Sequence, residues 1–132
     1  MNNNELIVRE AMRIVWNEGD ISRVDQFYSE DFEADYPMTD WGKGRSGVRA
    51  LVKKVREELA GYNEKIIELV DGGDEITVLL SISGRQPATK ELVAFRDVSI
   101  LSLQNGMIIR QRGVSDLMSL YSQLGLISLP KI

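Results

Sequence analysis

The stretch MIIRQRGVSDLMSLYSQLG, residues 107–125, decides the fold, because it begins as an apolar strand and ends as a helix. Asp116 stands at the junction between the two. Asp is among the best residues for capping a helix N-terminus, where its carboxylate accepts a backbone N–H. An acid at the end of a strand also suits the mouth of a pocket. The sequence leaves both roles open for Asp116, and the two are compatible.

The strand before Asp116 alternates charged with smaller residues. Arg110 and Arg112 alternate with Gln111, Gly113 and Ser115. Successive side chains of a strand point to opposite faces of its sheet. If the odd-numbered residues line a pocket, both Arg side chains therefore lie on the outer face.

Upstream, helical patterns come first and strand patterns follow. Apolar residues at helical spacing predict helices near residues 7–15, 21–29 and 46–59, the second capped by Asp20 or Ser22 and the third by Ser46. A strand precedes the third helix and stops near Pro37. Hairpin turns at 71–74 and 104–106 each join two of the four strands that follow the third helix. This order predicts one α+β domain over residues 1–132, with helices packed on a curved, mostly antiparallel sheet.

The late strands are apolar at both odd and even positions. Val98 and Ile100 fall on one side, and Val93, Phe95 and Leu101 fall on the other. Three short helices cannot cover both faces of such a sheet, so we expect a homodimer formed through the sheet.

Composition excludes several kinds of chemistry. The 132 residues contain no His and no Cys, so a Ser–His or Cys–His nucleophile is impossible and a metal site or other cofactor is not expected. The net charge of −4 argues against nucleic-acid binding. No apolar run is long enough for a membrane span, and no signal peptide is evident, so we expect a cytoplasmic protein. Acid–base chemistry must then come from Asp, Glu, Tyr, Lys or water.

Three segments carry a family resemblance: WNEGDISRVDQFYSEDFEADYP, GKGRSGVRALV and NGMIIRQRGVSDLMSLYSQLG. Their order and spacing resemble the nuclear transport factor 2-like superfamily, in its SnoaL-like polyketide cyclase branch, which is related to ketosteroid isomerase. The resemblance implies a cone-shaped fold that encloses a pocket. In SnoaL-like cyclases the Asp at the start of the last helix is the proposed acid–base residue, and Asp116 occupies that position.

The resemblance to ketosteroid isomerase supplies two more candidates. In VAFRD, Asp97 matches the isomerase's oxyanion-hole Asp, while Tyr36 stands at the position of its catalytic base and Met12 at that of its oxyanion Tyr. Asp97 and Tyr36 are therefore candidate hydrogen-bond donors to a developing oxyanion. Each also has a plainer reading, Asp97 as an ion-pair partner of Arg96 or Arg112 and Tyr36 as a core aromatic.

The sequence leads to three hypotheses about function. The first is a cyclase, isomerase or lyase that acts on a small apolar carbonyl compound. The second is a binding protein that uses the same pocket without turnover, and the third is a structural dimer with a filled pocket. The expected catalytic residues are Asp116, Asp97 and Tyr36, and the residues expected to bind substrate are Trp16, Met38, Trp41, Phe95, Gln111 and Ser115.

Overall fold

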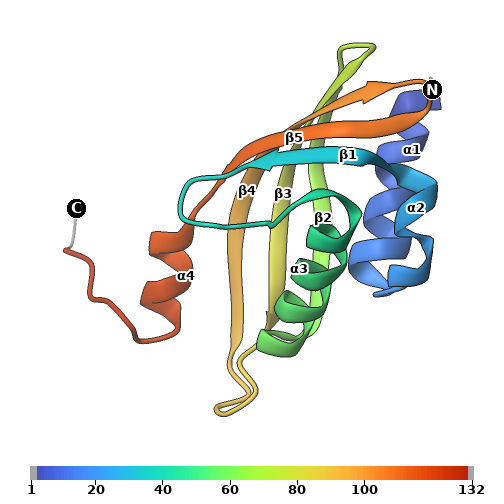
Figure 1. The fold of residues 1–132 in the computed structure, drawn as a ribbon. Coiled ribbons are helices and arrows are strands. Elements are labelled where there is room, and N and C mark those ends of the chain that lie inside the picture. Colours follow the sequence, from blue (N-terminus) through green and yellow to red (C-terminus); the bar gives the residue numbers. More distant parts are fainter. Residues whose placement is uncertain (1–2, 131–132) are drawn as a thin grey trace.

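The computed structural model describes residues 3–130, and a curved five-stranded sheet forms its centre (Figure 1). The strands lie in the order β1-β5-β4-β3-β2. Their bounds are Tyr28–Asp35 for β1, Ala60–Asp71 for β2, Glu75–Arg85 for β3, Leu92–Gln104 for β4 and Met107–Ser115 for β5. Strands β2 to β5 form an antiparallel meander, and β1 pairs with β5 in parallel. The expected α+β class with a mostly antiparallel sheet is confirmed.

The helices lie where the sequence places them, with differences at their ends. Their bounds are Asn3–Ala11 for α1, Val24–Phe27 for α2, Gly44–Glu58 for α3 and Leu117–Gln123 for α4. Helix α1 continues as a π-helix, Met12–Asn17, and a short 3-10 turn, Ile21–Arg23, precedes α2. Asp20 caps that turn by accepting a hydrogen bond from the Ser22 backbone N–H, as predicted.

The predicted cap of the third helix is wrong. Helix α3 begins almost one turn earlier, after Lys43, so that Ser46 already lies in its first turn and its hydroxyl donates to the Lys43 carbonyl. Gly47 explains the early start, because a Cβ atom there would lie 2.1 Å from the Trp41 carbonyl oxygen. Only glycine lets the preceding loop fold so tightly onto the helix.

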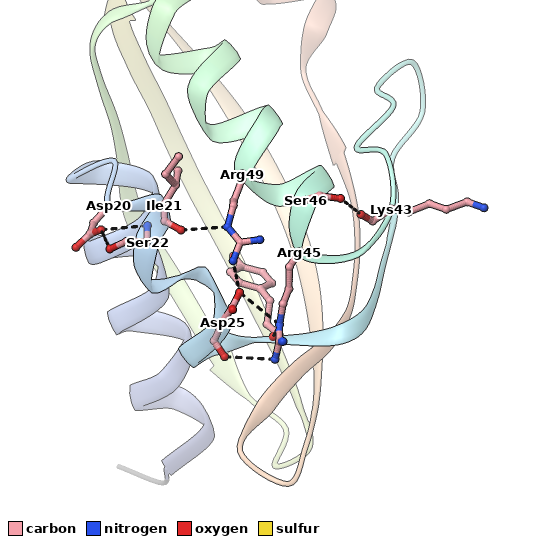
Figure 2. A network of polar contacts seen from close by, with 9 residues as sticks. Asp20, Ile21, Ser22, Asp25, Lys43, Arg45, Ser46 and Arg49 are labelled. Atoms are coloured by element: carbon pink, nitrogen blue, oxygen red, sulfur yellow. Dashed lines mark hydrogen bonds and ion pairs between the residues drawn. The ribbon is translucent and has the colours of Figure 1, made fainter.

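An ionic network fixes α3 against α2 and β1 (Figure 2). The Asp25 carboxylate pairs with both Arg49 and Arg45 from α3. Arg45 also donates to the Tyr28 carbonyl at 2.8 Å, and Arg49 donates to the Ile21 carbonyl at 3.3 Å. Two guanidinium groups that each bridge a carboxylate and a backbone carbonyl hold the helix in one orientation over the sheet.

The two faces of the sheet differ in character. The inward residues of β3 and β4 are buried, while Val98 and Val114 on the outer face are 45% and 63% exposed. Arg110 is exposed and Arg112 pairs with Glu75, so both Arg side chains lie away from the cavity, as predicted. Within residues 3–130, every helix is too short or too polar to cross a bilayer.

Candidate functional site

A cavity of about 830 Å³ lies between the concave face of the sheet and the helices. Its wall contains two of the three expected catalytic residues, Asp97 and Tyr36. It also contains all six side chains that the sequence predicted to bind substrate: Trp16, Met38, Trp41, Phe95, Gln111 and Ser115. Most of the remaining wall is apolar, which suits a largely apolar ligand.

Asp97 is a buried acid in this wall. It lies on β4, is 5% exposed, and accepts hydrogen bonds from the Ser99 and Ser115 hydroxyls at 2.6 Å and 2.5 Å. Within residues 3–130 no Lys or Arg pairs with it, so the suggested ion pair with Arg96 or Arg112 is not formed. Burial raises the pKa of Asp97 above its ordinary value, and the two serine hydroxyls oppose this shift. A carboxyl group whose pKa is raised by burial can accept a proton from a bound ligand and return it.

A chain of hydrogen bonds leads from Asp97 across β5. Ser99 contacts the Tyr36 hydroxyl at 2.5 Å, and the Gln111 amide donates to that hydroxyl at 2.8 Å. With Asp97 ionised, the donors of these hydrogen bonds follow one order. Gln111 donates to Tyr36, Tyr36 donates to Ser99, and Ser99 donates to the carboxylate. The Gln111 Oε1 atom is buried without a hydrogen-bond partner in the described part of the chain. An unpaired acceptor in a cavity wall fits a ligand that donates a hydrogen bond.

The Tyr36 ring is held between β5 and the loop before α3. It lies directly over Gly113, where a Cβ atom would come within 2.6 Å of the ring. On its other side it stacks on Trp41, with ring centroids 5.0 Å apart and planes inclined by 16°. Gly113 thus makes room for the Tyr36 ring, and the hydroxyl reaches Ser99 and Gln111. Burial raises the pKa of Tyr36 far above its ordinary value, so this hydroxyl stays protonated.

Asp116, the third expected catalytic residue, does not line the large cavity with Asp97 and Tyr36. It is exposed and caps α4 by accepting the Ser119 backbone N–H at 3.1 Å. It borders a shallower hollow instead, which Asp97, Ser115, Val114 and Met118 also line. The geometry therefore matches the capping role that the sequence allowed.

Sequence reasoning missed a second acid in the cavity, Glu64 on β2. The Tyr62 hydroxyl donates to the Glu64 carboxyl group, and both side chains line the cavity. Burial raises the pKa of Glu64 to about 8, and the nearby charge of Asp97 adds to the shift. The sequence signal was weak, because Tyr62, Glu64 and Ile66 simply alternate with Asn63 and Lys65. Over residues 3–130, no three acidic side chains gather as a metal site would require.

Comparison with known proteins identifies the family. The family model for SnoaL-like polyketide cyclases matches residues 6–124. The chain belongs to this family. No curated protein sequence matches the chain.

Solved structures agree on the fold of this family member. TsrD from Streptomyces laurentii superposes with a TM-score of 0.82 at 21% identity, over 95% of this chain and 96% of TsrD. A SnoaL-like polyketide cyclase from Agrobacterium tumefaciens gives a TM-score of 0.78 at 18% identity, over 95% and 100% of the two chains. At these identities the likeness establishes the fold alone, and activity has to be argued from the cavity itself.

Proposed function

We propose that this SnoaL-like protein transfers protons on a small, mostly apolar carbonyl compound bound in the cavity, as a cyclase, isomerase or lyase. The observation that carries the proposal is the Asp97 carboxyl group, which is buried in an apolar cavity and held by two serine hydroxyls without a cation. An ionised carboxylate buried at this depth without a charged partner is costly, so the site favours uptake of a proton by Asp97.

In the proposed reaction Asp97 removes a proton from the carbon next to the ligand's carbonyl group. The C–H electron pair moves into the enolate, and the negative charge passes from Asp97 to the ligand oxygen. Once Asp97 is protonated, it can donate to Ser99, and Ser99 can donate to Tyr36. The Tyr36 hydroxyl hydrogen is then free to turn toward the developing oxyanion. The return of the proton from Asp97 to another atom of the ligand completes the cycle.

This proposal gives Asp97 the acid–base role that the family resemblance suggested for Asp116. The difference rests on position, since Asp97 lines the large cavity and Asp116 is an exposed cap outside it. Tyr36 keeps its expected role as the donor to the oxyanion. The aromatic side chains of Trp16, Trp41 and Phe95 bind the apolar body of the ligand.

The test is hydrogen exchange into a probe ketone, 2-tetralone, whose protons next to the carbonyl are acidic. We expect the protein to accelerate exchange in D2O, followed by proton NMR, and Asp97→Asn to lower the acceleration by about 10²–10⁴-fold. Asp116→Asn is the matched control and should exchange like the wild type. Loss of exchange in Asp116→Asn with retention in Asp97→Asn would overturn the assignment.

The second candidate is a small-molecule binding protein without turnover. The unpaired Gln111 Oε1 atom favours ligand binding equally well under this reading, because it needs only a donor on the ligand. A protein that binds 2-tetralone in calorimetry yet never accelerates its exchange would support this candidate over the enzyme.

A further inference from the structure

The cavity wall has two polar regions with an apolar strip between them. Strands β4 and β5 contribute the first region, with Asp97, Ser99 and Gln111, and β2 contributes the second, with Tyr62 and Glu64. Strand β3 lies between them and contributes only Leu80 and Ile82. With strands spaced about 4.8 Å apart, the backbones of β2 and β4 lie about 10 Å apart. A ligand that contacts both regions therefore carries polar groups at two separate points, with an apolar part against Leu80 and Ile82 between them.

The Glu64 carboxyl group has the features of a ligand-binding group. Its hydrogen-bond partner is the Tyr62 hydroxyl, and no cation pairs with it anywhere in residues 3–130. It is half-buried because it opens into the cavity. Strand β2 bulges on both sides of it, between Ala60 and Asn63 and between Ile66 and Glu68. Bulges re-aim side chains and are common beside functional sites.

We propose that Glu64, supported by Tyr62, donates a hydrogen bond from its neutral carboxyl group to a second oxygen of the ligand, a carbonyl at the end remote from Asp97. This inference rests on the proposed function for the identity of the reacting end. The ligand is then an apolar carbonyl compound with oxygen functions at both ends. The two acids then have different roles. Asp97 accepts the proton, and Glu64 donates a hydrogen bond.

The protonation states support this division. The pKa of Glu64, about 8, keeps its carboxyl group neutral and able to donate at pH 7. Asp97 has two serine hydroxyls that favour its ionised form. Other titratable groups also line the cavity. They are Tyr62 on β2, Asp97 on β4, Tyr28 on β1, Tyr36 and Asp40 after β1, Lys54 and Glu58 on α3, and Tyr121 on α4.

The experiment compares two ligands that do not ionise, 2-acetylnaphthalene and 2-ethylnaphthalene, which differ in one carbonyl oxygen. Their dissociation constants are measured by fluorescence titration between pH 5.5 and pH 9.5. At low pH we expect the ketone to bind about five- to tenfold more tightly, the gain from one hydrogen bond. The preference should disappear as the pH rises through about 8, because ionised Glu64 cannot donate.

Variants identify the group that titrates. Glu64→Gln should keep the preference for the ketone, through its amide N–H, and lose the pH dependence. Tyr62→Phe should move the midpoint upward, because the Tyr62 hydroxyl favours the ionised form of Glu64. Glu57→Gln, the same change at an exposed acid on α3 that does not line the cavity, is the matched control and should behave as wild type.

The inference is overturned if the wild type shows no preference for the ketone, if the preference is independent of pH, or if Glu64→Gln titrates as the wild type does. These results are separate from the test of Asp97. Exchange of 2-tetralone without a ketone preference would refute only the role of Glu64. A Glu64-dependent preference without exchange would refute only the catalytic role of Asp97.

Discussion

The side-chain amide of Asn17 forms hydrogen bonds with both backbone groups of Glu64. Its Oδ1 atom accepts the Glu64 N–H at 2.6 Å, and its Nδ2 atom donates to the Glu64 carbonyl at 2.9 Å. Asn17 is the last residue of the π-helix and β2 is an edge strand, so the amide takes the place of a neighbouring strand. The contact fixes the position from which Glu64 enters the cavity.

Replacing Asn17 should therefore destabilise the protein. Asn17→Ala leaves a part-buried N–H and carbonyl of Glu64 unpaired, and we expect a loss of about 1–3 kcal/mol in the free energy of unfolding. Urea denaturation measures this loss. Asn63→Ala, at an exposed neighbour on β2, is the control and should cost much less. Equal effects of the two changes would show that the amide contact adds little.

Near the other end of the chain, the side-chain amide of Gln123 also takes the place of a neighbouring strand. Gln123 of α4 accepts the Ala94 N–H at 2.9 Å and donates to the Ala94 carbonyl at 2.7 Å, where β4 extends beyond its pairing with β5. Both amides belong to the segments that carry the family resemblance. Those segments predicted the fold well because they contain the contacts that attach helices to strands.

The cap of α4 gives a prediction that separates structure from catalysis. Asn caps a helix about as well as Asp, so Asp116→Asn should change stability by only a few tenths of a kcal/mol. Asp116→Ala should cost about 1 kcal/mol, because the bond to the Ser119 N–H is lost. Thermal unfolding of the two variants measures the difference. A large loss of ketone exchange in Asp116→Asn, with stability unchanged, would restore Asp116 as the acid–base residue.

Glu64 should make stability depend on pH. Its pKa is about 8 in the folded protein and near 4.5 in the unfolded chain, so the folded state holds its proton more tightly. The contribution is complete below about pH 4.5 and is lost as the pH rises through about 8. Compared with Glu64→Gln, the wild type should lose stability between pH 5 and pH 8.5 in urea denaturation. Parallel curves for the two proteins over that range would contradict the raised pKa.

The exposed apolar residues on the outer face of the sheet predict that the protein forms a homodimer. Val98 and Val114 are paired neighbours on β4 and β5 and are both well exposed. We expect a homodimer through this face at micromolar concentration, and Val98→Lys should dissociate it because the charge would be buried at the interface. Sedimentation measures the mass, and Leu126→Lys, outside the sheet, is the control. A wild-type mass of 14.9 kDa throughout the micromolar range would refute the dimer.

The sequence predicted most of the fold because its turns are explicit. Asn105 and Gly106 both adopt positive φ at the tip of the β4–β5 hairpin, as an Asn-Gly turn requires. The prediction that Ser46 caps the third helix was wrong, because the close approach between Gly47 and Trp41 moves the start of α3. No local sequence pattern encodes that contact. The parallel pairing of β1 with β5 likewise depends on contacts between residues far apart in the chain.

The candidate site could be predicted only in part. Strand alternation put Gln111 and Ser115 on one face, but only the packed sheet shows that this face meets Asp97. Glu64 was overlooked because an acid on an edge strand normally faces solvent. Its burial follows from the Asn17 contact and from the bulges of β2, which depend on tertiary structure.

The most direct test of the central claim is a carbon NMR titration of the Asp97 carboxyl group, assigned by the signal that Asp97→Asn removes. If Asp97 is the acid–base group of the cavity, its pKa should lie above the ordinary value of about 3.9, because burial disfavours the charged form. Addition of 2-acetylnaphthalene should raise it further by displacing water. A pKa at or below about 3.9 would mean a permanently ionised structural carboxylate and would contradict the proposed function.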